Sequence, residues 1–376
     1  MNARGRSWVY AVAAVFFGGL LAFAAHAVKN RGGGARDEGA ATTLTVARPE
    51  GIRIGDPITI EDLTLFPVFL ANQQDPGKMT SLAAALAAGA AEVRELGARD
   101  GTPPEPWQIP QGAGGPTVNT LVIANNGDVP IYVLAGTVVK GGNQDRQIAQ
   151  DFVVGAKSTV PVDAFCVEQG RWTGERDGVG TEGKFAAAEQ LAHATVRAAG
   201  QYESSQGEVW AEVAKVNSAN GKQKASGTLM ATLDDATVKG QREALAKRVR
   251  DALAKTKPSA ELVGMAYAVS GRVKGVRWFA SHELFELFEG TLASTAASDA
   301  LTSRQGAAPK PAPAMAADDV TRFVRDIDAA KAEEKATRAG NVNSYKKAKA
   351  GYGSETKYKP KAAPAAVPLS SDYVGK

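Results

Sequence analysis

The chain has 376 residues, 44% of them apolar and 22% charged, a composition typical of one to three globular domains with a large core. Its formal net charge is +4, and no basic patch interleaved with aromatic residues occurs in the body of the chain, so nucleic-acid binding is not expected. Cys166 is the only cysteine, which excludes an internal disulfide and a zinc site built from four cysteines.

Residues 1–27 have the pattern of a secretory signal peptide. Arg4 and Arg6 precede an uncharged apolar run over residues 8–25, and the Ala-His-Ala sequence at 25–27 fits the small-x-small site of a signal peptidase. We therefore expect an exported protein, periplasmic or secreted, from which this segment is removed. The alternative is an uncleaved membrane anchor, because residues 8–25 are about long enough to span a bilayer.

Regular structure is predicted to begin after a flexible Gly-rich spacer over residues 28–43. Isoleucines that alternate with polar residues over 52–60 predict one or two short strands, and the apolar run 63–70 predicts another. Ser81 can cap a helix predicted over residues 81–96, where leucine and valine recur at helical spacing.

A second β region is predicted after residues 97–117, which are rich in Gly and Pro and are expected to form an exposed loop. The segment Asn125–Asp128 in this region is a strong turn signal. The strands expected there cover residues 118–124, 129–139, 147–154 and 159–167.

The following block is predicted to be mainly helical. Its helices are expected over residues 181–199, 205–217 and 234–255. A β-hairpin is expected next, with strands over 262–269 and 273–279 that turn at Ser270-Gly271. Ser281 then caps a last core helix predicted over 282–301.

From residue 306 the composition shifts to Ala, Pro and Lys. One short amphipathic helix is predicted over 319–335, and the rest of 306–376 is expected to be a largely disordered basic tail, because it has too few large apolar residues for a core. The predicted domain therefore covers 44–305 and is of the α+β class. In it, an antiparallel β-rich N-terminal half packs with a helical segment, followed by a closing β-hairpin and helix.

Glycines, amides and charged residues are concentrated between apolar strands over residues 136–172. Three segments of this region resemble the ARPP-1 family, the ARG and rhodanese-phosphatase-superfamily-associated protein domain. They are residues 141–146 (Gly-Gly-Asn-Gln-Asp-Arg), 160–162 (Val-Pro-Val) and 166–172 (Cys-Val-Glu-Gln-Gly-Arg-Trp). The resemblance extends over roughly residues 50–305.

The resemblance implies an association with ADP-ribosylglycohydrolases and phosphatase-like proteins, and hence a link to ADP-ribose or nucleotide metabolism, but it supplies no mechanism. Family members often carry an acidic residue directly after the glycine that matches Gly136, and a lysine at the position of Asn143. Thr137 and Asn143 stand there in this chain, so chemistry that depends on the acidic residue or the lysine is not expected.

Gln144, Asp145 and Arg146 could form a clamp for a small anionic ligand. The planar guanidinium of Arg146 matches the oxygens of a phosphate or carboxylate, and Asp145 could position it. The structural alternative is an Asp–Arg pair that fastens a tight glycine-containing turn.

Glu168, Gln169, Arg171 and Trp172 directly follow an apolar strand, a place from which site residues often project. Glu168 could act as a general base or orient Arg171, and Trp172 could stack on a base or a sugar. The alternative is a buried Glu–Arg pair, with the tryptophan as a lid on the core.

Cysteine and histidine give little sign of catalysis. Cys166 lies between apolar neighbours and is expected to be a buried, inert thiol. His193 and His282 form no paired metal-binding pattern, so neither a metal nor another cofactor is expected.

Three functions are compatible with these features. The first is an exported, non-catalytic ligand-binding or scaffold module that uses the candidate residues above as its recognition surface. The second is a hydrolase or binding protein for ADP-ribose, a nucleotide-sugar or another phosphorylated ligand, with Glu168 or Asp145 as base and Arg146 and Arg171 as anion clamps. The third is an envelope-associated structural protein whose Lys-rich tail contacts anionic surfaces.

Overall fold

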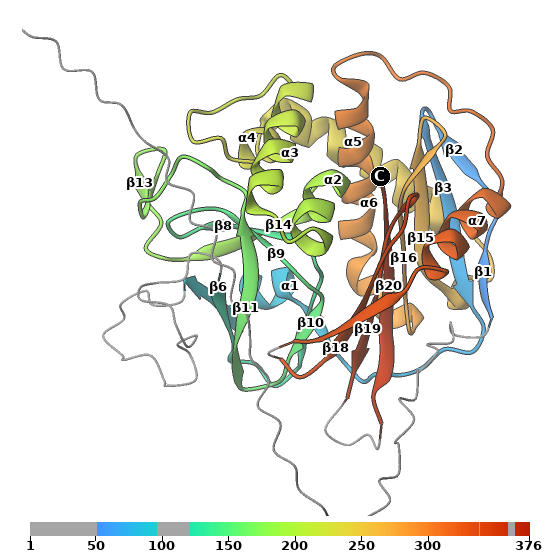
Figure 1. The fold of residues 1–376 in the computed structure, drawn as a ribbon, viewed down its shortest axis with the longest axis horizontal. Helices are drawn as coiled ribbons and strands as arrows, with labels where there is room; N and C mark the ends of the chain where they lie inside the picture. The colour runs from blue at the N-terminus through green and yellow to red at the C-terminus, as the bar shows by residue number, and fades with distance from the viewer. Residues whose placement is uncertain (1–50, 96–119, 338, 360–364) are drawn as a thin grey trace, which may run out of the picture. The chain divides into compact units, whose positions relative to one another are not determined.

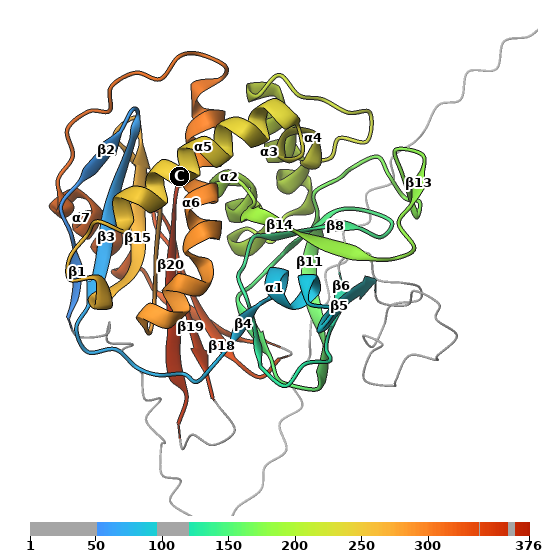
Figure 2. The same ribbon diagram turned by 180° about the vertical axis from the view of Figure 1, so that it is seen from behind.

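The computed structural model describes residues 51–95, 120–337, 339–359 and 365–376. These residues belong to one compact unit in which helices pack on antiparallel sheets (Figures 1 and 2), which confirms the predicted α+β class. The predicted signal peptide and spacer, residues 1–43, and the loop predicted over 97–117 lie outside the described residues.

The larger sheet has nine strands within the described residues, in the order β1-β3-β15-β16-β20-β19-β18-β17, with β2 also paired to β3. Its strands are β1 (Ile52–Ile54), β2 (Ile58–Ile60), β3 (Leu63–Leu70), β15 (Leu262–Val269), β16 (Arg272–Phe279), β17 (Ala332–Ala336), β18 (Val342–Lys347), β19 (Gly351–Tyr358) and β20 (Val367–Gly375). The turn between β15 and β16 has positive φ at Ser270 (49°) and Gly271 (78°), as the predicted two-residue hairpin requires.

Helices cover both faces of this sheet. On one face, Leu65 and Phe69 pack with α5 (Ala236–Leu253) and α6 (His282–Arg304), and on the other face Phe66 packs with α7 (Ala317–Asp328). Figure 1 shows α7 on the near side of the sheet, and Figure 2 shows α5 and α6 from behind. Because β3 is buried on both faces, its sequence is almost continuously apolar.

A second sheet has six strands, in the order β14-β8-β9-β11-β6-β5 within the described residues. Its strands are β5 (Ala91–Glu95), β6 (Thr120–Asn125), β8 (Thr137–Gly141), β9 (Arg146–Ile148), β11 (Ser158–Cys166) and β14 (Phe185–Leu191). Beside it, β4 (Thr80–Ser81), β7 (Ile131–Val133) and β10 (Phe152–Val154) pair together, and β12 (Glu175–Arg176) pairs with β13 (Val179–Gly180). The single strand predicted over 129–139 is therefore broken into β7 and β8, and Gly136 lies at the break with a φ of 83°.

The remaining helical elements are short, except α3. They are α1 (Leu82–Ala87), α2 (Ala194–Arg197), a π-helical turn (Ala198–Tyr202), α3 (Gln206–Ala219), α4 (Met230–Leu233) and a 3-10 turn (Ser259–Glu261). Ser81, Ser205, Asp235 and Ser281 accept backbone hydrogen bonds as N-caps of α1, α3, α5 and α6. The predicted helices over 205–217, 234–255 and 282–301 are thus confirmed.

Two helix predictions are wrong. The helix predicted over 81–96 ends early, because Gly89 adopts a φ of 67°, and the chain continues as β5, whose Ala91 and Val93 are buried while Glu92 is exposed. The helix predicted over 181–199 is replaced by β14 and α2. The partner strand β8 outweighs the helix propensity of the Ala-rich segment, since β14 pairs with it as the edge strand of the six-stranded sheet.

The prediction of a largely disordered tail over 306–376 is also wrong. Residues 317–328 form α7, which ends before residue 335, and residues 342–358 and 367–375 form strands of the larger sheet. Many of their buried positions hold small and hydroxyl-bearing residues, such as Gly353, Ser354 and Ser371, which a composition rule based on large apolar residues does not count. β20 lies between β16 and β19, inside the sheet.

Candidate functional site

The turn between β8 and β9 is built from residues that tolerate an unusual backbone. Gly141 and Gly142 have φ values of 142° and 46°, and a Cβ atom on Gly141 would collide with the carbonyl oxygen of Lys184. Asp145 closes the turn, because its Oδ1 accepts a hydrogen bond from the Gly141 backbone N–H at 3.0 Å. The Asp145 side chain therefore holds the turn from inside.

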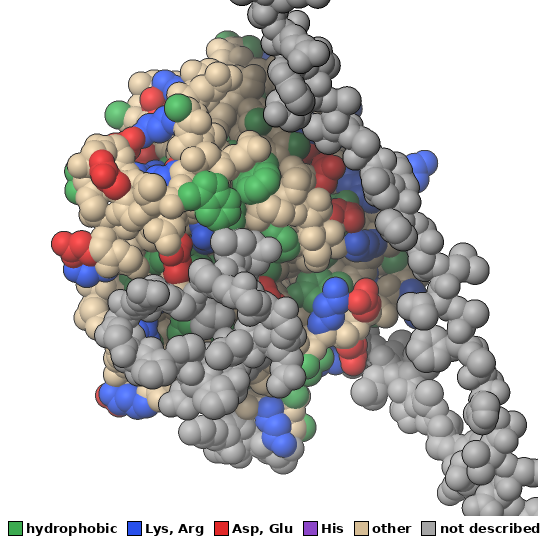
Figure 3. All heavy atoms as spheres, turned by 60° about the vertical axis from the view of Figure 1, so that its left-hand side comes forward, with side chains coloured by type: hydrophobic (Ala, Val, Ile, Leu, Met, Phe, Trp, Pro, Cys, Tyr) green, Lys and Arg blue, Asp and Glu red, His purple; other side chains and the backbone are tan. Residues whose placement is uncertain are grey.

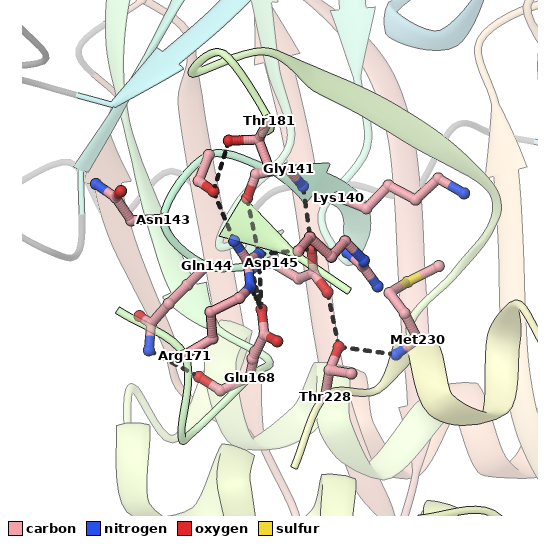
Figure 4. Close-up of polar contacts among 12 residues, drawn as sticks. Lys140, Gly141, Asn143, Gln144, Asp145, Glu168, Arg171, Thr181, Thr228 and Met230 are labelled. Carbon is pink, nitrogen blue, oxygen red and sulfur yellow. Dashed lines mark hydrogen bonds and ion pairs between the residues drawn. The ribbon is translucent and has the colours of Figure 1, made fainter. Parts of the chain in front are cut away.

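The end of β11 meets this turn. The Asp145 backbone N–H donates to Glu168 Oε2 at 3.1 Å, and Gln144 Nε2 donates to the Glu168 carbonyl oxygen at 3.0 Å. The Val167 N–H donates to the Asp145 carbonyl oxygen at 3.0 Å. The two segments singled out by the sequence thus form one cluster (Figure 4).

Arg171 joins the two segments. Its Nε donates to Glu168 Oε2 at 2.9 Å, Nη1 to the carbonyl oxygens of Gly142 and Thr173, and Nη2 to the Gly141 carbonyl oxygen, with Asp145 Oδ1 at 3.5 Å. An arginine has five N–H groups, and here they face five acceptors of the protein itself. The guanidinium therefore has no donor left for a ligand while this arrangement holds.

Asp145 is the centre of the cluster and is fully buried. Its Oδ2 accepts from Thr228 Oγ1 at 2.7 Å, and its Oδ1 also pairs with Arg176 Nη1. Burial raises the pKa of the Asp145 carboxyl above its ordinary value, although Arg176 and Thr228 act to lower it. Arg176 and Thr228 were not singled out by the sequence, because both lie outside segments 141–146 and 166–172, Thr228 by more than 50 residues.

Arg146 belongs to a different contact. Its Nη2 lies 3.3 Å from Glu95 Oε1, which also accepts the Asn143 backbone N–H at 3.0 Å. The Asp145–Arg146 side-chain pair considered as the fastener of the turn is therefore replaced by Arg171–Asp145 and Arg146–Glu95 pairs.

Gln169 and Trp172 are the exposed members of the predicted set. The Gln169 N–H is bonded to the Ser226 carbonyl oxygen, while its side chain lies at the surface. Trp172 is 52% exposed, so it is not a lid on the core. Among the described residues, Trp172 and Val179 are the exposed large hydrophobics, and Figure 3 turns the side of the molecule that carries β13 toward the viewer.

A model of the ARPP-1 domain, the ARG and Rhodanese-Phosphatase-superfamily-associated Protein domain, matches residues 51–366. The chain belongs to the ARPP-1 family. The match extends beyond the predicted boundary at residue 305 and takes in α7, β18 and β19. No curated protein and no solved structure matches the chain.

The other candidate residues of this ARPP-1 domain have structural partners. Cys166 is buried, and burial raises the pKa of its thiol, which disfavours the nucleophilic thiolate. His193 caps α2, with Nδ1 accepting from the Thr195 N–H and Nε2 3.4 Å from Asp299 Oδ1. In the described residues, no group of three or more His, Cys, Asp or Glu residues is arranged to hold a metal ion.

The sequence missed a second group of buried charges in the ARPP-1 domain. Arg277 contacts Asp151 (Nη1–Oδ2, 3.0 Å) and Asp372 (Nη2–Oδ2, 2.9 Å), and Arg197 Nη1 lies 3.1 Å from Asp372 Oδ2. Burial alone would raise the pKa of Asp372, but Arg277 and Arg197 outweigh it and lower that pKa. The available signal was an isolated charge in an apolar strand, as in Val-Arg277-Trp and Ser-Asp372-Tyr.

Proposed function

We propose that this ARPP-1 domain is a non-catalytic binding or scaffold module, in which the signature residues act as an internal frame. The observation that carries the proposal is the complete use of the Arg171 N–H groups by acceptors of the protein itself. Asp145 and Glu168, at 0% and 1% exposure, are held in the same frame. What this frame leaves at the surface for recognition is Gln169 and Trp172.

A hydrolase is less well supported by this arrangement. A general base must come within hydrogen-bond distance of the proton that it removes. Glu168 instead accepts from Arg171 and from the Asp145 backbone, and Asp145 accepts from Gly141, Thr228 and two arginines. No observation in the described residues favours turnover of ADP-ribose or a nucleotide-sugar over binding.

The decisive experiment is a turnover screen of the purified full chain. ADP-ribose, ADP-glucose and p-nitrophenyl phosphate are the probes, and we expect no product above the buffer blank. Glu168→Gln and the exposed Glu182→Gln serve as matched variants. Turnover that disappears in Glu168→Gln and persists in Glu182→Gln would overturn the proposal.

We also propose that the module is exported, on the pattern of residues 1–27. In the described part of the chain, no helix is long and apolar enough to cross a membrane, and residues 8–25 lie outside that part. Intact-mass measurement of the protein from cells tests the proposal: cleavage leaves a chain that begins at Val28, whereas an anchored chain keeps its apolar segment. The envelope-associated alternative loses its premise of a free basic tail, since Lys346 and Lys347 lie on β18 and pair with Asp328 and Glu203.

A further inference from the structure

A pocket with a volume of about 580 Å³ opens between α5, the end of α6, the segment after α3 and the β2–β3 turn. One face of α5 forms a wall, because its lining residues recur at three- and four-residue spacing. Figure 2 shows α5 lying across α6, from whose upper end the chain runs on toward α7. No residue of segments 141–146, 160–162 or 166–172 lines this pocket.

Cations outnumber carboxylates in the lining. Lys222, Arg248 and Arg304 face the pocket together with one carboxylate, that of Glu61. Glu61 lies in the β2–β3 turn and bridges the two arginines, with Arg304 Nη2 at 2.9 Å from its Oε2 and Arg248 Nη1 on its Oε1. Counted over the lining alone, three cations and one carboxylate leave a formal charge of +2.

Two further carboxylates lie outside the lining, and each pairs with one of these cations. Asp62 accepts from Arg304 Nε at 3.1 Å, and Asp235 lies 2.8 Å from Lys222 Nζ. Three cations and three carboxylates make the whole group neutral, so the protein itself leaves no unbalanced charge at the pocket. It nevertheless has more donors than acceptors, because among the described residues Arg248 contacts only Glu61, through Nη1, and is half exposed.

The rest of the wall is partly apolar, beside the polar side chains of Asn220, Thr237 and Gln241. Val238, Ala244 and Leu245 of α5 and Leu301 of α6 line the pocket beside the cations. Pockets of this size that combine an apolar wall with a few converging polar groups are typical of small-molecule sites.

We propose that this pocket binds a small organic anion. Its carboxylate or phosphate accepts hydrogen bonds from the free edge of Arg248, with Arg304 and Lys222 beside it, and its apolar body lies against α5. A guanidinium suits either oxyanion, since both offer two oxygens to its parallel N–H groups. The site is separate from Gln169 and Trp172, so a failure of this proposal leaves the non-catalytic assignment standing, and turnover elsewhere would leave this pocket untouched.

Calorimetric titration of the full chain tests the proposal with four probes: phenyl phosphate, benzoate, inorganic phosphate and benzyl alcohol. We expect one or both aromatic anions to bind, and the tighter of the two identifies the preferred oxyanion. Arg248→Gln should weaken that binding about ten-fold or more, the loss expected for a charge-assisted hydrogen bond. Ala244→Phe, which fills the pocket from an exposed helical position without changing charge, should weaken it similarly.

The matched control is Lys247→Gln. Lys247 is the neighbour of Arg248 on α5 and does not line the pocket. The Lys247→Gln variant loses the same charge as Arg248→Gln, together with one ion pair, to Asp251. It should therefore bind the aromatic anions as tightly as the wild type does. Absence of binding by both aromatic anions, or equal affinity in Arg248→Gln and the wild type, overturns the site. If benzyl alcohol binds as tightly as the aromatic anions, the site is not selective for anions. If inorganic phosphate binds as tightly as they do and Ala244→Phe has no effect, the apolar part of the site is overturned.

Discussion

Nη1 of Arg277 lies 3.0 Å from Oδ2 of Asp151, although 126 residues separate them in the chain. Arg277 is on β16 of the larger sheet, and Asp151 lies between β9 and β10. The Asp151 carboxylate also accepts the Ala135 N–H at 2.6 Å and the Tyr132 hydroxyl at 3.0 Å. One buried ion pair therefore connects the larger sheet to the region of β7–β10, which contains the turn between β8 and β9.

Replacement of Arg277 by methionine should show how much this ion pair contributes to stability. Arg277→Met leaves Asp151 without its cation and Asp372 with Arg197 alone, so we expect the free energy of unfolding to fall by about 3–5 kcal/mol at neutral pH. The pKa of Asp372, held low by both arginines, should rise in the variant, and the loss should therefore shrink in mild acid. Urea unfolding at the two pH values measures both effects.

The control for Arg277 is an exposed pair on α7. Arg322 Nη1 lies 3.2 Å from Asp319 Oδ1, with both side chains open to solvent. Arg322→Met should change stability by less than about 1 kcal/mol. Equal losses in the two variants would contradict the role assigned to the buried pair.

Arg171 and Trp172 are neighbours with opposite expected behaviour. Arg171→Gln should destabilise the fold by about 3–5 kcal/mol, because it leaves Glu168 and Asp145 buried with fewer cations. Trp172→Ser should change stability by less than about 0.5 kcal/mol, since its side chain is exposed. Thermal unfolding of both variants compares their stabilities. An Arg171→Gln protein as stable as the wild type would argue against a structural role for Arg171.

Arg176 gives a pH-dependent prediction. The pKa of Asp145 is raised in the folded protein, mainly by burial, so its ionised form costs stability as the pH rises through that pKa. Arg176→Gln removes a cation from Asp145 and should raise this pKa further. The variant should lose about 1–3 kcal/mol at neutral pH and recover part of it as the pH falls below the raised pKa.

Lys224 is the matched control for Arg176. It pairs with the exposed Asp177, whose pKa is lowered by the hydrogen bond and charge of Lys224. Lys224→Gln should therefore cause a much smaller loss, and that loss should persist in mild acid. It should disappear only below the ordinary pKa of an aspartate, where Asp177 becomes protonated in both proteins. Chemical unfolding across mild acid distinguishes the two carboxyls, and identical pH profiles would contradict the assignment.

β20 gives the fourth prediction. Deletion of residues 367–376 removes an interior strand and the carboxylate of Asp372, so the shortened chain should show no cooperative unfolding transition. In the intact chain, the backbone amides of residues 369–374 should be among the slowest to exchange with deuterium. Rapid exchange there, as expected of a disordered tail, would refute this arrangement.

Local signals predicted much of the fold. The Ser270-Gly271 turn and the caps at Ser81 and Ser281 act within a few residues, and the structure confirms them. The strand β14 was missed because its conformation depends on β8, about 50 residues earlier in the sequence. The strands after residue 342 were missed because glycine and hydroxyl side chains fill their interior positions.

The sequence predicted which residues form the candidate site but not that they are buried. The sequence brought together Gln144, Asp145, Glu168 and Arg171, and the structure places them in one cluster. Their burial depends on partners such as Thr228, which lies 83 residues from Asp145 in the chain. Because such partners carry no local pattern, the sequence left a ligand clamp and a fastened turn as open alternatives.

The interior position of β20 also affects how the protein is made. β16 and β19, the two neighbours of β20, are synthesised before it. Until residues 367–375 have emerged from the ribosome, both strands keep an unpaired edge and the guanidinium of Arg277 lacks Asp372. The larger sheet is therefore completed only after these residues are translated, and until then its two unpaired strand edges are accessible to chaperones.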